Sequence, residues 1–372
     1  MDDEARTRSG LDSRREPRGR APWNRRWPPR HARHDGAPQG HARTAYAALD
    51  LGTNNCRLLV ARPNREGFRV IDAFSRIIRL GEGMAASGRL GDAAISRAIE
   101  ALGVCRDKMH NRGVTRARLI ATEACRSAAN GIEFRDRVKD EVGLELEIVD
   151  RETEAGLAAI GCTPLMDPQC DGVILFDIGG GSSEIVRLGR NRPATGGPPE
   201  PCIRGWASLP IGVVSLAERY GGVKVDRVVF DAMTAEVRAY VERFAAEYGD
   251  GLALDAIHLL GTSGTVTTIA GVHLRLKRYD RRQVDGCWMT DQEVSVVLEE
   301  LLAMDYDGRV ASPCIGGERA DLVMAGCAIL EAIRQVFPCT RLRVADRGLR
   351  EGMLVELMRA DGVWNGAQAN AP

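Results

Sequence analysis

The sequence predicts an α/β protein made of two duplicated domains with a cleft between them. From Ala45 onward, short apolar runs of strand length alternate with stretches whose apolar residues recur at helical spacing. One plan occurs twice, around Asp50 and around Asp177: a buried strand that ends in aspartate, a glycine turn and a returning strand. The chain has 372 residues and is 44% hydrophobic, which is enough for two cores of ordinary size. Two copies of one hairpin predict two related domains that face each other.

The first domain is predicted over residues 45–172. A hairpin opens it, a third strand follows, and strands then alternate with amphipathic helices. Asp92 is placed to cap the N-terminus of the first long helix. The expected strands are 45–51, 56–61, 68–79, 118–122 and 144–149, and the expected helices are 92–109 and 132–142.

The second domain is predicted over residues 173–344 and repeats the plan. The expected strands are 173–178, 183–188, 256–260 and 341–345, and the expected helices lie near 225–248, 291–304 and 321–336. A loop rich in proline and glycine is expected at 191–201. A last helix, within about 345–360, is assigned to the first domain, and residues 361–372 are expected to form a frayed tail.

The leader at 1–44 is crowded with Arg, Pro, Gly and His and has almost no aliphatic residues. Such a segment cannot bury enough apolar surface to offset the entropy lost on ordering, so it is predicted to be disordered. Its positive charge could attract a polyanion. The segment could equally be a solvated tail or an overextended start of translation.

Composition excludes several classes of protein. Lys plus Arg and Asp plus Glu each number 51, which argues against a general nucleic-acid or membrane binder. No apolar run approaches the roughly 20 residues that span a bilayer, and the N-terminus lacks a secretory signal, so we expect a cytoplasmic protein. The ten cysteines form no C-x-x-C pair, which makes a zinc site improbable and favours reduced core thiols.

Three loops rich in glycine and hydroxyl residues predict phosphate binding. Glycines let the backbone approach a ligand closely, and consecutive N–H groups in such turns cradle phosphate oxygens. The third loop also leads into a helix-compatible run, whose N-terminus favours anions. One such loop is more typical of an ordinary hairpin, whereas three together favour phosphate. The candidate residues are Gly52, Thr53, Asn54 and Asn55; Gly179, Gly180, Gly181, Ser182 and Ser183; and Gly261, Thr262, Ser263, Gly264 and Thr265.

Acidic residues beside these loops predict a metal and a catalytic base. Asp177 and Glu184 flank the second loop and could converge on one Mg²⁺, although Asp177 could instead cap the turn and Glu184 could be an exposed strand residue. Asp150 is predicted to cap a helix whose first turns contain Glu154. Glu154 could activate a water molecule, or it could be a surface carboxylate favoured by the helix dipole.

At this point the sequence resembles the exopolyphosphatase and guanosine pentaphosphate phosphohydrolase (Ppx/GppA) family. The resemblance implies the actin, Hsp70 and sugar kinase superfold, with two ribonuclease H-like domains around an active-site cleft. It implies that Glu154 is the general base, that Asp177 and Glu184 are metal-binding or catalytic acids, and that Arg126 lines the cleft. The stretches that carry the resemblance are 49–54, 121–126, 150–157, 177–184 and 261–265, and it extends over almost all of residues 45–358.

Two departures from the family pattern stand out. Gly156 occupies a position where members usually have arginine, so the contribution of that side chain is missing or comes from elsewhere. The chain resembles the short, two-domain form of the family, without the C-terminal helical domains of long members. Processive action on long chains is therefore in doubt, and a homodimer is expected by analogy with short members.

The function implied is Mg²⁺-dependent hydrolysis of the terminal phosphoanhydride of inorganic polyphosphate, which releases orthophosphate. Guanosine pentaphosphate, cleaved at its 5′-triphosphate, is the alternative substrate. A kinase of the same superfold and a non-catalytic polyphosphate-binding module are alternatives of other classes. Arg57, Arg79 and Arg126 are candidate additional cations at the site, or else members of surface ion pairs.

Overall fold

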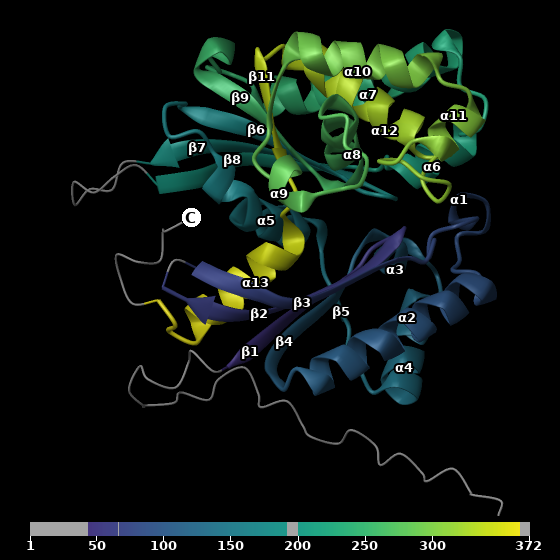
Figure 1. Ribbon diagram of the computed structural model, residues 1–372, viewed down its shortest axis with the longest axis vertical. Helices are drawn as coiled ribbons and strands as arrows, with labels where there is room; N and C mark the ends of the chain where they lie inside the picture. Colours follow the sequence, from purple (N-terminus) through teal and green to yellow (C-terminus); the bar gives the residue numbers. More distant parts are fainter. Residues whose placement is uncertain (1–43, 66, 192–199, 365–372) are drawn as a thin grey trace, which may run out of the picture. The chain divides into compact units, whose positions relative to one another are not determined.

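The computed structural model describes residues 44–65, 67–191 and 200–364, which form two mixed β-sheets flanked by helices (Figure 1). Almost all of the predicted leader, and most of the predicted loop at 191–201 and of the predicted tail, lie outside these residues. The first sheet has the order β3-β2-β1-β4-β5. Its strands are β1 (Ala45–Leu51), β2 (Asn55–Asn64), β3 (Gly67–Ile77), β4 (Val114–Ala121) and β5 (Glu147–Ile148).

The second sheet has the order β10-β11-β9-β6-β7-β8. Its strands are β6 (Gly172–Ile178), β7 (Ser183–Asn191), β8 (Glu200–Leu209), β9 (Ile257–Thr262), β10 (Trp288–Thr290) and β11 (Arg341–Ala345). β1 pairs antiparallel with β2 and parallel with β4, just as β6 pairs antiparallel with β7 and parallel with β9. The order β3-β2-β1-β4-β5 is therefore repeated as β8-β7-β6-β9-β11. The predicted duplication of a ribonuclease H-like sheet is confirmed.

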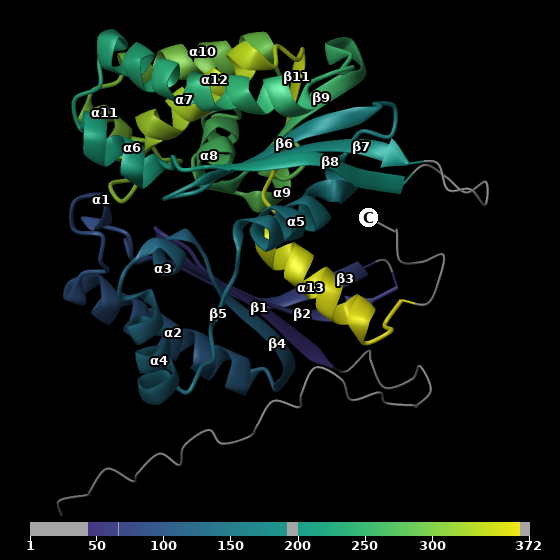
Figure 2. The ribbon, with the colours of Figure 1, turned by 180° about the vertical axis from the view of Figure 1, so that it is seen from behind.

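Helices lie against both sheets (Figure 2). In the first half these are α1 (Met84–Ser87), α2 (Asp92–Asn111), α3 (Glu123–Ser127), α4 (Gly131–Val142) and α5 (Arg151–Cys162). After β6 come α6 (Val213–Tyr220), α7 (Arg227–Tyr248), α8 (Ser263–His273), α9 (Arg281–Val284), α10 (Asp291–Ala303), α11 (Tyr306–Ala311), α12 (Val323–Val336) and α13 (Leu349–Ala360). Short 3₁₀ turns lie at Thr163–Leu165 and Leu254–Ala256. Eight of the ten cysteines are buried, as expected for small core residues.

The two predicted helix caps have different outcomes. The Asp150 side chain accepts a hydrogen bond from the Thr153 N–H at 2.7 Å, so it caps α5 as expected. The prediction for Asp92 is wrong: Gly91 is the N-cap of α2, and Asp92 is the first helical residue. An acid in the first turn is still favoured by the positive end of the helix dipole, which explains why the sequence pattern alone did not separate the two positions.

Two helices, α5 and α13, cross between the sheets, where both ribbon views place them side by side (Figures 1 and 2). Their backbones approach so closely that a Cβ atom added to Gly161 would lie 2.0 Å from the Gly348 carbonyl oxygen, and one added to Gly352 would lie 2.0 Å from that of Leu157. Only glycine fits at these two contacts. The crossing therefore depends on a pair of glycines.

The two helices face different sheets. In α13, Met353 and Leu354 pack with Tyr46 and Ile120 of the first sheet. In α5, the apolar side chains Ala155, Ala159 and Cys162 pack with residues of β6, β7 and β9. We call β1–β5, α1–α4 and α13 the first lobe, and β6–β11 with α6–α12 the second lobe. Although α13 follows the second lobe in sequence, it packs against the sheet of the first lobe.

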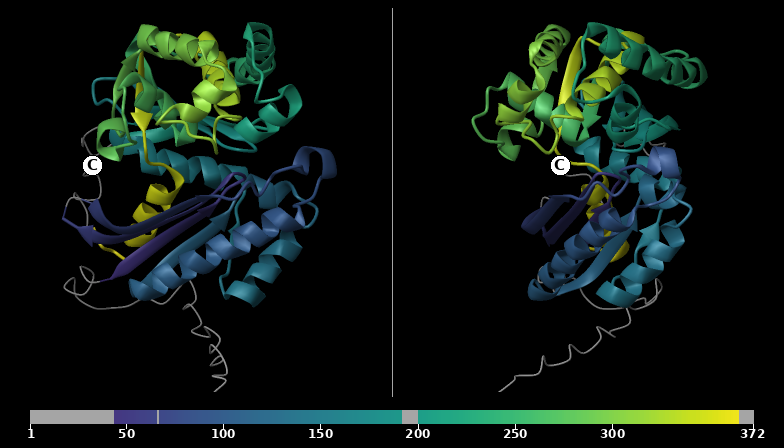
Figure 3. Two further views of the ribbon diagram at one scale, coloured as in Figure 1. Left: turned by 45° about the vertical axis from the view of Figure 1, so that its right-hand side comes forward. Right: turned by 90° about the vertical axis from the view of Figure 1, so that its right-hand side faces the viewer.

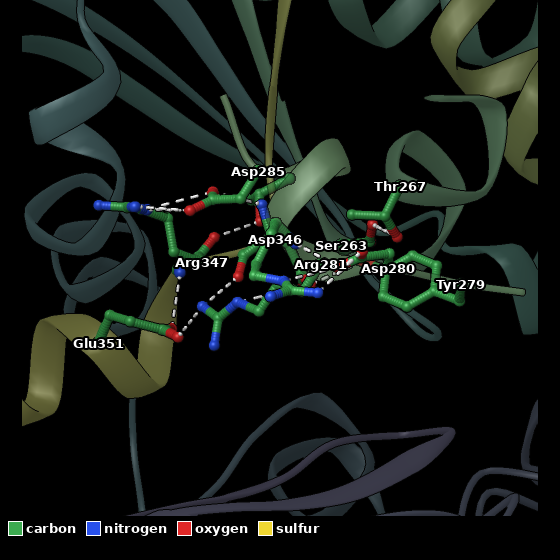
Figure 4. Close-up of polar contacts among 12 residues, drawn as sticks. Ser263, Thr267, Tyr279, Asp280, Arg281, Asp285, Asp346, Arg347 and Glu351 are labelled. Atoms are coloured by element: carbon green, nitrogen blue, oxygen red, sulfur yellow. Dashed lines mark hydrogen bonds and ion pairs between the residues drawn. The ribbon is translucent and has the colours of Figure 1, made fainter. Parts of the chain in front are cut away.

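A polar network fixes the connection between β11 and α13 (Figure 4). Arg281 of the second lobe donates to the Asp346 carbonyl at 2.5 Å and to Glu351 of α13 at 2.8 Å. Arg347 forms an ion pair with Asp285, and Tyr279 donates to the Asp346 carboxylate at 2.6 Å. Hydrogen bonds and an ion pair therefore hold the segment through which the chain passes from the second lobe to the first.

Within the described ranges, no helix combines the length and the apolar character that crossing a membrane requires.

Candidate active site

A cleft between the lobes brings together residues from all three predicted phosphate loops. Its empty space, which continues into open solvent, measures about 910 Å³. The predicted loop residues that line it are Gly52, Thr53, Asn54 and Asn55; Gly179, Gly180, Gly181 and Ser182; and Ser263, Gly264 and Thr265. Arg57, Glu154, Asp177 and Glu184 also line it.

The first and second loops touch across the cleft, and glycine makes this contact feasible. A Cβ atom added to Gly180 would lie 3.0 Å from the Cβ atom of Thr53, and one added to Gly181 would lie 2.9 Å from the Thr53 hydroxyl oxygen. Side chains at either position would push the lobes apart. The two duplicated loops therefore form the opposite walls of one site.

The carbonyl oxygens of both loops are occupied by N–H groups from further along the chain. The Asn54 carbonyl accepts from Ile78 and Arg79 at 2.8 and 3.1 Å. The Gly179 and Gly180 carbonyls accept from the first residues of α6 at 2.9 and 2.8 Å. A carbonyl oxygen repels an anion, so engaging these oxygens elsewhere makes the loops better suited to phosphate.

Three predicted phosphate contacts lie outside the lining. Gly261 and Thr262 end β9, because they pair with β11 and β6, and α8 begins only at Ser263. The Thr262 hydroxyl donates to the Arg347 carbonyl at 2.5 Å. The Ser183 side chain is fully buried and donates to the Ile211 carbonyl at 2.8 Å. The third loop is thus two residues shorter than predicted, and Ser183 has a structural hydrogen bond instead.

Asp177 and Glu184 are direct neighbours across the antiparallel pair of β6 and β7, so their side chains share one face of the sheet. Burial raises the pKa of Asp177 to about 6. Burial, with repulsion from Asp177, raises the pKa of Glu184 to about 7, although the hydroxyls of Ser182 and Ser208 each donate to it at 2.8 Å. Glu184 is only 3% exposed, so it is not the exposed strand residue of the alternative interpretation.

Glu154 lies in the first turns of α5 and faces the cleft, which rules out the interpretation as a surface carboxylate. Arg126 forms an ion pair with it at 3.0 Å. Burial and then repulsion from Glu184 raise the pKa of Glu154 well above its usual value, while Arg126 acts in the opposite direction. A buried carboxyl group with competing neighbours is typical of a functional site.

The three arginines considered as additional cations have three different positions. Arg57 lines the cleft. Arg126 does not line it but holds Glu154 and also donates to Glu123 at 2.5 Å. Arg79 lies outside it and pairs with Asp321 at 2.9 Å. Only Arg57 is therefore placed to meet a ligand directly.

Sequence reasoning missed several lining residues, above all Arg319, which precedes α12. A Cβ atom added to Gly264 would lie 3.5 Å from Nη1 of Arg319 and 3.9 Å from Nη2 of Arg57. Among the residues that the structure describes, neither guanidinium has an ion-pair partner. Two cations, one from each lobe, thus converge on the third loop. The other missed lining residues include Asp50, Thr122, Glu123 and Thr268.

The acidic residues fit a hard divalent cation with few protein ligands. Among the described residues, no group of three or more His, Cys, Asp or Glu could hold a metal ion. Asp177 and Glu184 nevertheless form a neighbouring acidic pair that lines the cleft, and burial raises the pKa of each. Mg²⁺ is commonly bound through one or two carboxylates, with water and phosphate oxygens completing its shell. The donor set fits that arrangement.

Comparisons with known proteins identify related sequences and a similar fold. A sequence model of the Ppx/GppA phosphatase family matches residues 59–361. Exopolyphosphatase 2 of Mycobacterium tuberculosis is 26% identical over 329 residues, which cover 85% of this chain and 99% of that protein. Guanosine-5′-triphosphate,3′-diphosphate pyrophosphatase of Pseudoalteromonas translucida is 25% identical over 319 residues, which cover 85% of this chain but only 60% of that enzyme. The crystal structure of an Aquifex aeolicus Ppx/GppA protein superposes with a TM-score of 0.68 at 27% identity, covering 85% of this chain and 98% of that one.

Proposed function

Because the chain belongs to the Ppx/GppA phosphatase family, we propose that it hydrolyses the terminal phosphoanhydride of inorganic polyphosphate and releases orthophosphate. One observation carries the proposal. Three carboxylates, Glu154, Asp177 and Glu184, face three glycine and hydroxyl loops within one cleft. The carboxylates can activate water and hold a metal ion, and the loops can bind the oxygens of a phosphate chain. Family membership favours hydrolysis over a kinase or a non-catalytic binding module.

The loops and the arginines would bind the substrate. Thr53 offers a hydroxyl group, and the glycine turns allow phosphate to approach the backbone. Arg57 of the first lobe and Arg319 of the second lobe, which both lie beside Gly264, would neutralise negative charge on the phosphates. Phosphoryl transfer depends mainly on such positioning and electrostatic stabilisation.

Glu154 would act as the general base. It would take a proton from a water molecule as the water oxygen attacks the terminal phosphorus in line with the bridging oxygen. The bond from phosphorus to that bridging oxygen breaks, and the shortened chain leaves with the negative charge. The raised pKa of Glu154 makes the carboxylate a stronger base than an exposed glutamate, while Arg126 keeps it oriented.

Asp177 and Glu184 would hold Mg²⁺. When bound, the ion would supply positive charge that offsets the charge on the phosphate oxygens. Removal of divalent ions with a chelator should therefore abolish phosphate release, and Mg²⁺ should restore it.

Guanosine pentaphosphate is the second candidate substrate. The relatives named guanosine-5′-triphosphate,3′-diphosphate pyrophosphatase support it, although the chain spans about three fifths of their length. Both compounds end in a phosphoanhydride beside further phosphates. Release of phosphate from each, measured side by side with the same purified protein, distinguishes the two.

The substitution Glu154→Gln tests the proposed base. We expect turnover to fall by roughly 100- to 10,000-fold with the fold intact, because the amide cannot accept the proton from water. Glu152→Gln is the matched control, since Glu152 lies in the same helix but is exposed, and it should keep wild-type turnover. Near wild-type phosphate release by Glu154→Gln would show that another group is the base.

A further inference from the structure

Arg79 connects the two lobes outside the catalytic cleft. Its guanidinium donates to both carboxylate oxygens of Asp321, at 2.9 and 3.1 Å, and to the Glu318 carbonyl at 3.2 Å. A second contact lies close by in sequence, where the Gly83 N–H donates to Glu218 of α6 at 2.9 Å. Both ribbon views place α1, which follows Gly83, next to α6 (Figures 1 and 2). This edge of the first lobe is therefore fastened to the second lobe.

On the second lobe, Arg79 holds the segment that carries Arg319. Its two partners, Glu318 and Asp321, lie immediately before and two residues after Arg319. Arg319 itself turns to the cleft and lines it with Leu322. Leu322 and Asn54 also line the neighbouring pocket that contains Arg79 and Asp321. The interlobe contact thus directly adjoins the phosphate site.

On the first lobe, Arg79 is fixed to the first phosphate loop. Its own N–H and that of Ile78 donate to the Asn54 carbonyl, and the Gly81 N–H donates to the Thr53 carbonyl at 2.9 Å. The backbone of Arg79 has a φ of 46°, in the left-handed region that residues other than glycine rarely adopt. Such a conformation persists only where the surroundings hold it, and it is found most often at functional sites.

We propose that Arg79 and Asp321 form a clasp that positions Arg319 against the first phosphate loop. Arg79 is then a positioning residue of the reaction, and this inference rests on the proposed function. With the clasp intact, the ligand-free protein already holds the first phosphate loop of one lobe and Arg319 of the other in the arrangement that binds a phosphate chain. Without it, the substrate itself must bring the lobes together, so the binding-competent fraction of the protein falls.

The substitution Arg79→Ala tests the clasp through the split between KM and kcat. We expect KM for short-chain polyphosphate to rise about fivefold, the scale set by a partly exposed ion pair, and kcat to stay within about twofold. The charge exchange Arg79→Asp with Asp321→Arg should recover most of the lost KM. A fall in kcat with KM unchanged would contradict the proposal. It would also be contradicted if Arg79→Ala left KM unaltered and the charge exchange did not restore the wild-type KM.

Arg116→Ala is the matched control. Arg116 and Asp361 form an ion pair with two hydrogen bonds at 2.8 and 2.9 Å. The side chains of that pair are 34% and 20% exposed, close to the 33% and 23% of Arg79 and Asp321. The control pair, however, joins two parts of the first lobe. Arg116→Ala should leave KM unchanged, and an equal rise in both variants would overturn the clasp.

A double-mutant cycle with Arg319 separates positioning from general destabilisation. If Arg79 acts through Arg319, then Arg79→Ala should raise KM little further in a protein that already carries Arg319→Ala. Independent, multiplicative effects on KM would refute the proposed route through Arg319.

Small-angle X-ray scattering of the ligand-free proteins tests, independently of catalysis, whether the clasp holds the two lobes together. We expect the radius of gyration to increase in Arg79→Ala and to stay at the wild-type value in Arg116→Ala. If the wild-type protein released no phosphate from either candidate substrate, the proposed function would fail, and the scattering would still decide whether the clasp holds the lobes. An unchanged radius in Arg79→Ala would overturn it.

Discussion

On one side of the cleft the lobes are joined by α5, α13 and the bonded connection after β11, whereas on the other they meet through Arg79, Asp321 and the contact of Gly83 with Glu218. Figure 3 shows the crossing helices between the two sheets from two further directions. The first junction is covalent, tightly packed and dependent on glycine. The second consists of hydrogen bonds between partly exposed side chains and backbone. The difference teaches that chain continuity and close packing join the lobes on one side, whereas hydrogen bonds join them on the other.

The largest effect is expected where the crossing helices touch. Gly161→Ala would place a methyl group 2.0 Å from the Gly348 carbonyl oxygen, so the helices must move apart. We expect the free energy of unfolding to fall by about 3 kcal/mol in urea titrations. Gly103→Ala in α2 is the control, because nothing lies within 4 Å of the added atom and alanine favours the helix. Similar stability of the two variants would mean that α5 and α13 can move apart at Gly161 at little cost in free energy.

Acid should lower the free energy of unfolding through His258, which lies in β9 of the second sheet. Its Nδ1 donates to the Leu259 carbonyl at 2.8 Å and its Nε2 accepts from the Asp167 N–H at 3.1 Å, so the folded protein holds the neutral ring. Burial lowers the pKa of His258 to about 4. Since this is below the value of about 6.5 for an unfolded chain, its stabilising contribution is complete above pH 6.5 and is lost as pH falls towards 4.

The loss through His258 amounts to about 3 kcal/mol at most over that interval. Urea unfolding at several values between pH 7 and 4 measures it. His258→Gln cannot ionise, so its stability should depend less steeply on pH in this range, whatever its stability at pH 7. Equal slopes for the two proteins would show that His258 is not the group responsible.

Ion pairs on the two sides should differ in their effect on stability. Arg281→Ala would leave the Glu351 carboxylate, whose side chain is 7% exposed, without its cation, and we expect a loss of about 2 kcal/mol. Arg79→Ala removes a pair whose members are about one quarter to one third exposed, and we expect a loss of about 1 kcal/mol or less. Thermal unfolding of both variants under the same conditions compares them. A larger loss of stability in Arg79→Ala than in Arg281→Ala would contradict the distinction drawn between the two junctions.

The sequence was sufficient for features that depend on local pattern. The duplicated hairpins, the cap at Asp150 and the acidic pair formed by Asp177 and Glu184 follow from strand length, capping chemistry and position beside a turn. The end of β9 was misplaced because glycine and threonine are typical of loops, whereas here pairing with β11 and β6 extends the strand through Thr262. Tertiary pairing outweighed local preference at that point.

Contacts between distant segments left no local signal. Arg79 and Asp321 are 242 residues apart, and nothing near either residue predicts that they pair. Arg319 lies in a stretch without the alternation of strand and glycine turn by which the other candidates were found. Its role became visible only when the fold placed it beside Gly264. Sequence reasoning thus identified many of the residues that line the cleft, but not the contacts that join the lobes beside it.

The hydrogen bonds that engage the Asn54 and Gly180 carbonyls have a consequence for how the loops can change. Each brace comes from a backbone N–H group, at Ile78 and Arg79 in one half and at Val214 in the other. Backbone donors are present whatever the side chain, except in proline. The curvature of each proposed phosphate loop can therefore be kept when the side chains at these donor positions change. Proline at position 78 or 214 is the exception, because it has no N–H group to donate.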